Sequence, residues 1–144
     1  EKFYCNRSGG LYQWNEAMGY SKVEGAQGIC PTGWHIPTLA EFEELKSAVN
    51  NNGYALFAKE EFSFIEEANS SGFSALLAGE YMNSRFDGYG GEVYYTTTFW
   101  GSTDSNTDGA ITLRMVSFDL SIDSVDLNNL NKDSGFSVRC VKDN

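Results

Sequence analysis

Hydrophobic residues recur at helical spacing in two segments of the first third of the chain. In residues 39–49 they form one stripe, made of Leu39, Phe42, Leu45 and Val49. Thr38 stands just before this stripe and Glu41 follows three residues later, which is the capping-box pattern of a helix start. The sequence therefore predicts a helix that begins after Thr38 and ends at the NNNG sequence of residues 50–53.

A second, shorter helix is predicted nearer the N-terminus. After Gly9 and Gly10, four apolar residues share one helical face: Leu11, Trp14, Ala17 and Met18. Gly19 fits the end of this helix. Residues 54–71 mix aromatic and acidic residues and predict no more than one further helical turn.

From Gly72 onward, aromatic and β-branched residues replace helix formers, which predicts short strands and loops. Apolar and polar residues alternate between residues 111 and 127, and the alternation slips between Met115 and Val116 and again near Ser124. We therefore expect two strands separated by a turn or bulge. The polar positions of this segment are expected to share an exposed face: Ser117, Asp119, Ser121, Asp123 and Asp126. The sequence FSVRCVK, at residues 136–142, predicts a last strand.

Length and charge restrict the class of protein. A chain of 144 residues is most simply one domain, residues 1–144, with a single core. The 20 acidic and 10 basic side chains give a net charge of −10, which opposes binding to nucleic acid and to anionic lipid. The chain has no stretch of about 18 apolar residues and no basic leader before an apolar run. We therefore expect no membrane insertion and no signal peptide, and interpret the sequence as a mature or excised fragment.

Cysteine and histidine are too few and too scattered to predict a zinc site. Cys5, Cys30 and Cys140 lack the paired spacing of zinc ligands, and His35 is the chain's one histidine. An odd number of cysteines leaves one thiol free or bonded to a partner outside this chain. No residue stands beside His35 at a spacing that marks a catalytic dyad, so we favour a packed, hydrogen-bonded histidine over a catalytic one.

Acidic residues are unevenly distributed along the chain. All 12 glutamates lie at or before Glu92, whereas seven of the eight aspartates lie at or after Asp104. Residues 101–131 contain no Glu, Lys, Gln or Trp. Propensity explains much of this difference, because turns favour Asp and strands disfavour Glu, Lys and Gln.

Five sequence strings occur in one order along the chain: GGLYQW, GICPTGWHIPT followed by an acidic helix, GFSALLAGEY, FWGST and GFSVRCVKD. Together they closely resemble the Fibrobacter succinogenes major paralogous domain (FISUMP), a module of secreted bacterial proteins, over residues 9–143. The resemblance implies an α+β fold of the C-type lectin-like class, in which two helices pack on small antiparallel β-sheets. That class also holds formylglycine-generating enzymes and the variable proteins of diversity-generating retroelements.

The resemblance gives the CPTGWHIPT turn a structural role. In this kind of fold the turn leads into the second helix: Pro31 and Pro37 fix the backbone, and Gly33 permits the bend. Trp34 is expected to fill the core beneath it. The turn is therefore interpreted as a corner of the fold and not as a reaction centre.

A disulfide between Cys30 and Cys140 follows from the same resemblance, since each cysteine belongs to one of the family's strings. Cys5 is then the odd cysteine. Closing a loop of about a hundred residues stabilises a chain by a few kcal/mol, up to roughly 4.7 in the chain-entropy account. An extracellular or cell-surface location is expected.

The function that the resemblance implies is a non-catalytic extracellular recognition or adhesion module, monomeric as an isolated domain. Its surface for a protein or glycan ligand is expected on the loops and hairpin of residues 101–131, because short polar residues on rigid strands offer hydrogen bonds at low entropic cost. The candidate ligand-binding residues are Trp100, Asp104, Asn106, Asp108, Thr112, Arg114, Ser117, Asp119, Asp123, Asp126, Asn128 and Asn129. No catalytic residue, metal ligand or cofactor is assigned.

Diversification offers a second account of the uneven composition. In retroelement-diversified proteins of this fold, the gene changes at the adenines of asparagine codons. The changed codons cannot encode Glu, Lys, Gln, Trp or Met. In residues 101–131 only Met115 breaks that exclusion, and we expect it to be a fixed core position. The hypothesis is that this segment is, or descends from, a diversified binding surface.

Other functions stay open as alternatives. A structural module of a cell-surface or fimbrial protein needs the same stable, acidic domain. The DSNTDG string of residues 104–109 resembles part of a calcium loop but lacks the terminal glutamate, which leaves a structural calcium ion or a calcium-dependent lectin as alternatives. An enzyme of the formylglycine-generating kind needs reactive cysteines near a metal and is disfavoured. Carbohydrate could also stack on Tyr94, Tyr95, Phe99 or Trp100, although these rings suit the core equally well.

Overall fold

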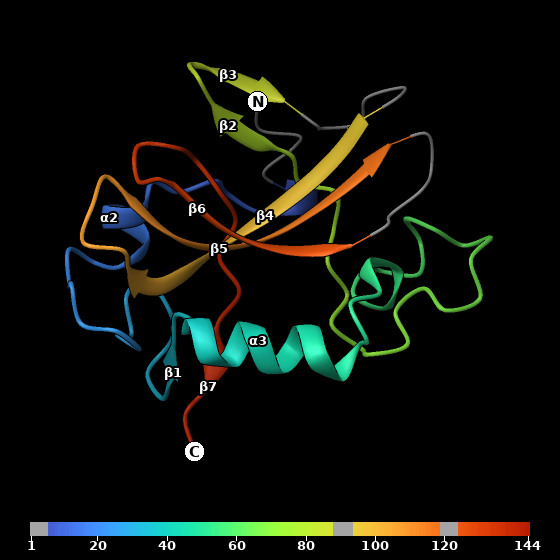
Figure 1. Ribbon diagram of the computed structural model, residues 1–144, viewed down its shortest axis with the longest axis horizontal. Helices are drawn as coiled ribbons and strands as arrows, with labels where there is room; N and C mark the ends of the chain where they lie inside the picture. The colour runs from blue at the N-terminus through green and yellow to red at the C-terminus, as the bar shows by residue number, and fades with distance from the viewer. Residues whose placement is uncertain (1–5, 88–93, 119–123) are drawn as a thin grey trace.

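The centre of the protein is a three-stranded antiparallel sheet. The computed structural model describes residues 6–87, 94–118 and 124–144. Within them β4 (Tyr94–Asp104), β5 (Gly109–Phe118) and β6 (Val125–Asn131) lie side by side in that order. Helix α3 (Leu39–Ala48) covers one face, and the hairpin of β2 (Glu80–Met82) and β3 (Arg85–Asp87) lies on the other side (Figure 1). The expectation of an α+β fold with small antiparallel sheets is confirmed.

Strands β4 and β5 pair over most of their length. Residues 95–100 are all aromatic or β-branched, which favours an extended strand. The register shift that the structure shows lies between Trp100 and Asp104. The two strands expected in residues 111–127 are found as β5 and β6, but no break lies between Met115 and Val116, because β5 continues through both residues. Met115 is fully buried and Val116 is half-buried on the opposite face, so neighbouring residues are both apolar and the alternation is lost.

Helix α3 forms as its sequence pattern predicts. Thr38 Oγ1 accepts a hydrogen bond from the Glu41 N–H (3.3 Å), and Glu41 Oε2 accepts one from the Thr38 N–H (2.8 Å), which completes the capping box. Phe42 is buried, and Leu45 and Val49 pack beside it in a hydrophobic cluster with the sheet. The helix therefore fixes one face of the sheet as core.

The N-terminal segment covers part of the opposite face. Helix α2 (Trp14–Ala17) places the buried Trp14 in a second hydrophobic cluster with Trp100 and Phe136. This helix is shorter than the one predicted from residue 11. The reason is that Tyr12 pairs with Phe136 through two backbone hydrogen bonds of 2.8 and 3.0 Å, which keep the chain extended before Trp14.

The C-terminal segment is divided between two partners and is not the continuous last strand that was predicted. Ser137 lies beside β4, where its N–H donates to Thr98 O and its carbonyl accepts from Trp100 N–H, both at 3.0 Å. Farther on, β7 (Val141–Lys142) pairs with β1 (Trp34–His35). The outer edge of β4 is thus partly covered, and β6 forms the other edge of the main sheet.

The corner before α3 is closed by the disulfide between Cys30 and Cys140, whose Cα atoms lie 5.9 Å apart, and this confirms the predicted pairing. Gly33 has a φ of +83°, which is the conformation that the bend needs glycine for. The prediction that Trp34 fills the core is wrong, because the residue is 38% exposed. The β1–β7 pair lies at the periphery of the molecule, and Ile36 fills the core instead (Figure 1).

Outside these elements the chain is largely irregular. The helical turn expected in residues 54–71 is found as η1 (Gly53–Ala55), where Asn52 Oδ1 accepts a hydrogen bond from the Tyr54 N–H. Among the helices in the described ranges, none is long and apolar enough to cross a membrane.

Candidate functional site

Two of the predicted ligand-binding residues lie inside the protein. Trp100 is 0% exposed, its ring packs against Phe136, and its Nε1 donates to Tyr12 O at 2.7 Å. Thr112 is also 0% exposed, and its hydroxyl donates to Asn128 O at 3.2 Å. Neither side chain can reach an external ligand, so placing them on a binding surface was wrong. Both lie on the sheet face that the N-terminal segment covers, and sequence alternation alone could not show this.

Arg114 is held in place by a buried carboxylate. Its Nη2 donates to Glu80 Oε1 at 2.6 Å and its Nε donates to Glu80 Oε2 at 3.1 Å. The Glu80 side chain is 4% exposed and that of Arg114 is 26% exposed. The hydroxyls of Thr96 and Thr98 also donate to Glu80 Oε2, at 3.5 and 2.9 Å. The guanidinium is therefore held in one position by Glu80, and the side chain as a whole keeps partial contact with solvent.

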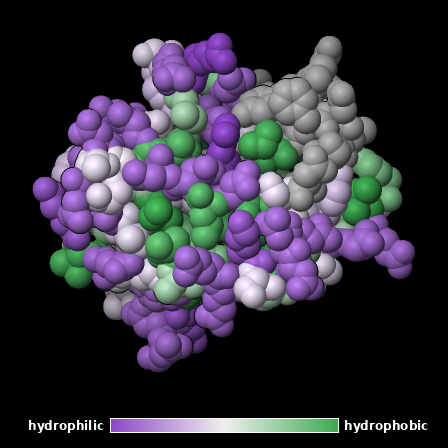
Figure 2. Space-filling model, viewed as in Figure 1, coloured by the Kyte–Doolittle hydropathy of each residue, from purple (hydrophilic) through white to green (hydrophobic). Residues whose placement is uncertain are grey.

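Polar residues of β6 lie next to Arg114 on the same face of the sheet. Asp126 is directly opposite Arg114 in the β5–β6 register and is exposed, and its Oδ1 accepts from the Ser124 hydroxyl at 3.1 Å. Asn128 lies two residues farther along β6 and is half-buried. We call Arg114, Asp126 and Asn128 the β5–β6 polar face. Figure 2 shows that polar and apolar side chains mix on the side of the molecule that carries β6.

The turn at residues 104–109 forms a separate group at the end of β4. Asp104 Oδ1 accepts from the Asn106 N–H at 2.9 Å and from Lys132 Nζ at 2.6 Å. The hydrogen bond from Lys132 lowers the pKa of Asp104 most, partial burial opposes it, and the Asn106 N–H lowers it further. Asn106 and Asp108 are exposed. The turn thus presents two polar side chains on a backbone that Lys132 braces.

Asn129 does not join the β5–β6 polar face, because it alternates with Asn128 and points to the other side of the sheet. Its side chain packs against Gly109, where an added Cβ would lie 2.4 Å from Asn129 Oδ1. Asp119 and Asp123, together with Ser121, lie outside the described residues. For Ser117 only the backbone position is described. The expected shared face can therefore be followed only for Asp126, which is exposed as predicted.

His35 is a packed, hydrogen-bonded residue, as expected. Nδ1 lies 2.7 Å from Asp143 Oδ1, and Nε2 lies 2.9 Å from Glu41 Oε1. The hydrogen bond to Asp143 raises the pKa of His35 most, partial burial opposes it, and Glu41 raises it further. The two carboxylates bind opposite ring nitrogens, so they cannot converge on one metal ion. The His35 group links the C-terminal segment to the start of α3.

Metal ligands do not converge in the part of the chain that the structure describes, where no group of three or more His, Cys, Asp and Glu side chains is arranged to hold an ion. In the calcium-like turn, Lys132 Nζ lies within 2.6 Å of Asp104 Oδ1 and 3.2 Å of Thr107 O. The ammonium group therefore occupies the side of the turn where a cation would bind its oxygens.

Glu80 is the residue that sequence reasoning missed. It lies in the GFSALLAGEY string, next to an apolar run, and Arg114 is the only basic residue between positions 101 and 131. An isolated acid in an apolar context and an isolated base on a strand are candidates for a buried pair. That signal could have suggested the contact, but it could not have established which charges meet.

The disulfide-closed corner, the small antiparallel sheets and the ion pair across the sheet define a compact α+β domain with a rigid polar face. The chain belongs to the family described as the Fibrobacter succinogenes major domain, whose model matches residues 1–142. This confirms the resemblance seen in the sequence strings. No curated protein and no solved structure matched the chain.

Proposed function

We propose that this domain is a non-catalytic recognition module of an extracellular bacterial protein. It has a C-type lectin-like fold and binds a protein or glycan through the β5–β6 polar face, and the exposed Asn106 and Asp108 of the separate turn at residues 104–109 are further candidate contacts. The observation that carries this proposal is the Glu80–Arg114 ion pair, which fixes the partly exposed side chain of Arg114 beside the exposed Asp126.

A fixed polar surface favours binding because less side-chain freedom is lost when the ligand arrives. A surface arginine with a flexible side chain loses rotamer entropy on binding, whereas the side chain of Arg114 is ordered by Glu80 before any ligand is present. Asp126 stands across the strand from it and can accept hydrogen bonds. A surface that pairs one donor group with one acceptor group suits the hydroxyls of a glycan or the peptide groups of a protein.

The Cys30–Cys140 disulfide supports both the location and the lack of catalysis. Disulfides persist in oxidising compartments, which favours an extracellular module. The bond also uses both of the cysteines that an enzyme of the formylglycine-generating kind would draw on, since it leaves neither as a thiolate.

Diversification of residues 101–131 belongs to the same proposal. Met115, the one residue that adenine-directed change of asparagine codons cannot produce, is 0% exposed and lies in the core, as expected for a fixed position. Exposed positions such as Asn106, Asp108 and Asp126 carry residues that such changes can produce. The codons of the gene test this part, because scattered third-position bases across residues 110–129 would contradict it.

The experiment is a glycan-array and surface-protein screen with the intact domain, run in calcium and in chelator. A hit is then measured with the variants Asp126→Ala and Asn128→Ala, which change the polar face without touching Glu80. Asp133→Ala is the matched control, because Asp133 is an exposed aspartate beyond the end of β6.

Binding that falls in the two face variants, stays in the control and ignores chelator supports the proposal. Equal binding by all three variants would move the ligand site elsewhere. Binding lost only in chelator would favour the calcium-dependent lectin. No ligand in either screen would favour the structural module of a cell-surface or fimbrial protein.

A further inference from the structure

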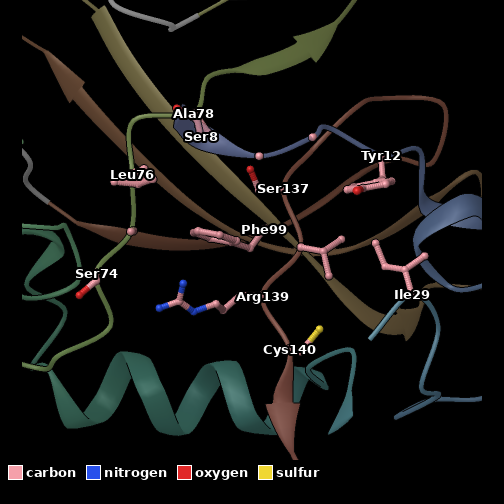
Figure 3. Close-up of a pocket in the computed structure, with 14 residues that line it drawn as sticks. Ser8, Tyr12, Ile29, Ser74, Leu76, Ala78, Phe99, Ser137, Arg139 and Cys140 are labelled. Carbon is pink, nitrogen blue, oxygen red and sulfur yellow. The ribbon is translucent and has the colours of Figure 1, made fainter. Parts of the chain in front are cut away.

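A groove of about 290 Å³ opens at the outer edge of β4, on the opposite edge of the sheet from β6 (Figure 3). Its walls come from three segments, at residues 8–10 and 12, 74–76 and 78, and 137–140, together with Ile29 and Phe99 of β4. Its volume is at the lower end of the range for small-molecule sites, which is about 300–1,000 Å³. Segments far apart in the sequence therefore form one concave surface.

Ser137 places an unpaired hydroxyl in the wall of this groove. The residue is 6% exposed, and its Oγ has no hydrogen-bond partner among the described residues. The Oγ atom is itself buried and the backbone is fixed by the bonds to Thr98 and Trp100, so the hydroxyl reaches a ligand in the groove by rotation of the side chain about χ1. Buried hydroxyls are almost always paired, because an unpaired one costs free energy. Thr97 Oγ1 also has no hydrogen-bond partner in the described part of the chain, but Thr97 is not among the described residues that line the groove.

Arg139 gives the groove a positive charge. Its guanidinium carbon lies 4.7 Å from the centroid of the Phe73 ring, and Nη2 donates to the Phe73 carbonyl. These two contacts fix the group at the Ser74 end of the groove (Figure 3). None of the described residues that line the groove is an aspartate or glutamate, although the chain carries 20 acidic and 10 basic side chains. An anion is therefore favoured here, in a protein whose net charge is −10.

The rest of the lining is apolar and partly exposed. Phe99 is 5% exposed and forms part of the floor, while Tyr12 and Ile29 are 38% and 43% exposed at the other end. Gly10 lets the Tyr12 ring lie close to the backbone, since an added Cβ would lie 3.3 Å from three atoms of the tyrosine. Exposed apolar side chains of this size gain free energy when a ligand covers them.

We propose that this groove binds a small apolar carboxylate, either a free acid or the C-terminal residue of a peptide. The carboxylate pairs with Arg139, a polar group of the ligand pairs with Ser137 Oγ, and the apolar body lies on Phe99, Tyr12 and Ile29. This site is independent of the β5–β6 polar face.

The first test compares the binding of an acid and of its uncharged amide analogue to the unaltered domain. N-acetyl-L-phenylalanine and N-acetyl-L-phenylalaninamide are titrated into the ¹⁵N-labelled domain and followed by amide chemical shifts. The acid is expected to bind about tenfold more tightly or better, because the amide lacks the charge-assisted hydrogen bonds to Arg139. Equal binding of the two, or no binding of the acid, would overturn the proposal, as would binding of glucuronic acid alone.

A peptide ending in phenylalanine, with a free or an amidated terminus, distinguishes the two sources of the carboxylate. Binding of the free-terminus peptide as tight as that of the small acid assigns the groove to chain ends. Binding of the small acid alone assigns it to a free metabolite-like acid. Both outcomes retain the same carboxylate chemistry.

Variants then connect the binding to the two named residues. Arg139→Gln is expected to weaken binding of the acid about tenfold and to leave binding of the amide unchanged. Arg85→Gln is the control, because Arg85 is an exposed arginine of β3. Ser137→Ala is expected to weaken binding while the thermal midpoint stays equal or rises, because the hydroxyl has no partner among the described residues to lose. A fall in the thermal midpoint with unchanged binding would assign Ser137 a purely structural role. It would overturn the proposed contact between Ser137 Oγ and the ligand. Asp126→Ala retains acid binding, which separates this site from the proposed function.

Discussion

Two hydrogen bonds join Arg114 of β5 to Glu80 of β2, at 2.6 Å from Nη2 and 3.1 Å from Nε, across 34 positions of sequence. The pair links the β2–β3 hairpin to the main sheet. Glu80 also accepts bonds from the hydroxyls of Thr96 and Thr98 on β4, so its carboxylate is a meeting point of three strands. The same contact that orders the candidate binding face therefore also holds the fold together.

Removing one partner of this pair is expected to destabilise the domain. Arg114→Ala leaves the Glu80 carboxylate buried without the arginine. Removing one partner of a fully buried ion pair costs about 3–5 kcal/mol. We expect about 2–3 kcal/mol here, because the Arg114 side chain is 26% exposed. Urea unfolding measures the change in free energy. The control is Arg85→Ala, which breaks an exposed pair with Asp87 and costs at most about 1 kcal/mol. Equal losses in the two variants would show that the burial of Glu80 contributes nothing.

The His35 group makes stability depend on pH in two opposite directions. The pKa of His35 is raised above its ordinary 6.5, mainly by Asp143, so the folded state binds this proton more tightly than the unfolded state. The contribution of His35 to the free energy of unfolding is complete below pH 6.5. It is lost as the pH rises through the higher pKa that His35 has in the folded state. For Glu41, burial opposes ionisation most, but hydrogen bonds from Thr38 and His35 outweigh it and lower the pKa below 4.5. That contribution is lost as the pH falls through the lower folded pKa.

The expected result is a maximum of stability between these two limits. Urea unfolding across the pH range measures it, and His35→Gln is expected to flatten the alkaline side while keeping much of the acid loss, because Glu41 retains its bonds from Thr38. A variant profile parallel to that of the original protein above pH 6.5 would show that another group causes the alkaline loss.

Local signals in the sequence predicted what local contacts determine. The α3 helix was predicted from Thr38, Glu41 and the apolar stripe because a capping box involves residues three apart. Helix α2 was also predicted, but its start was not, because the pairing of Tyr12 with Phe136 depends on a residue 124 positions away, and no pattern around residue 11 reports it. The five strings in one order indicated the family, and the resemblance to that family implied the disulfide.

The candidate site was predicted less completely, for a related reason. Alternation along β5 identifies two faces but not which of them is covered, and here both are covered in part. Trp100 and Thr112 are buried by the N-terminal segment, whereas Arg114, on the same face as Thr112, keeps contact with solvent. Polar residues such as Thr112 can lie in the core when their hydrogen bonds are satisfied, and only the packed structure shows that they are.

The disulfide is expected to contribute strongly to stability. Cys30 and Cys140 are 110 positions apart, and cross-linking a loop of this size stabilises by about 4–5 kcal/mol in the chain-entropy account. The variant Cys30→Ser/Cys140→Ser, or reduction of the original protein, is expected to lose most of this in urea unfolding. Cys5→Ser is the control, because it leaves the bond intact. Unfolding curves that coincide with and without reductant would contradict the prediction.

Calcium is expected to leave the stability of the domain unchanged. The ion takes six to eight oxygen ligands at about 2.3–2.6 Å, and the turn at residues 104–109 already has Lys132 Nζ bound to Asp104 Oδ1 and Thr107 O. The same ammonium lies 4.5 Å from the centroid of the Trp14 ring, so displacing it would lose an ion pair and a cation–π contact together. The thermal midpoint in calcium should therefore equal that in chelator, while Lys132→Gln lowers stability by about 1–2 kcal/mol. A midpoint that rises with calcium in the original protein would restore the calcium-loop interpretation, because it would mean that the ion outcompetes Lys132 for the oxygens of the turn.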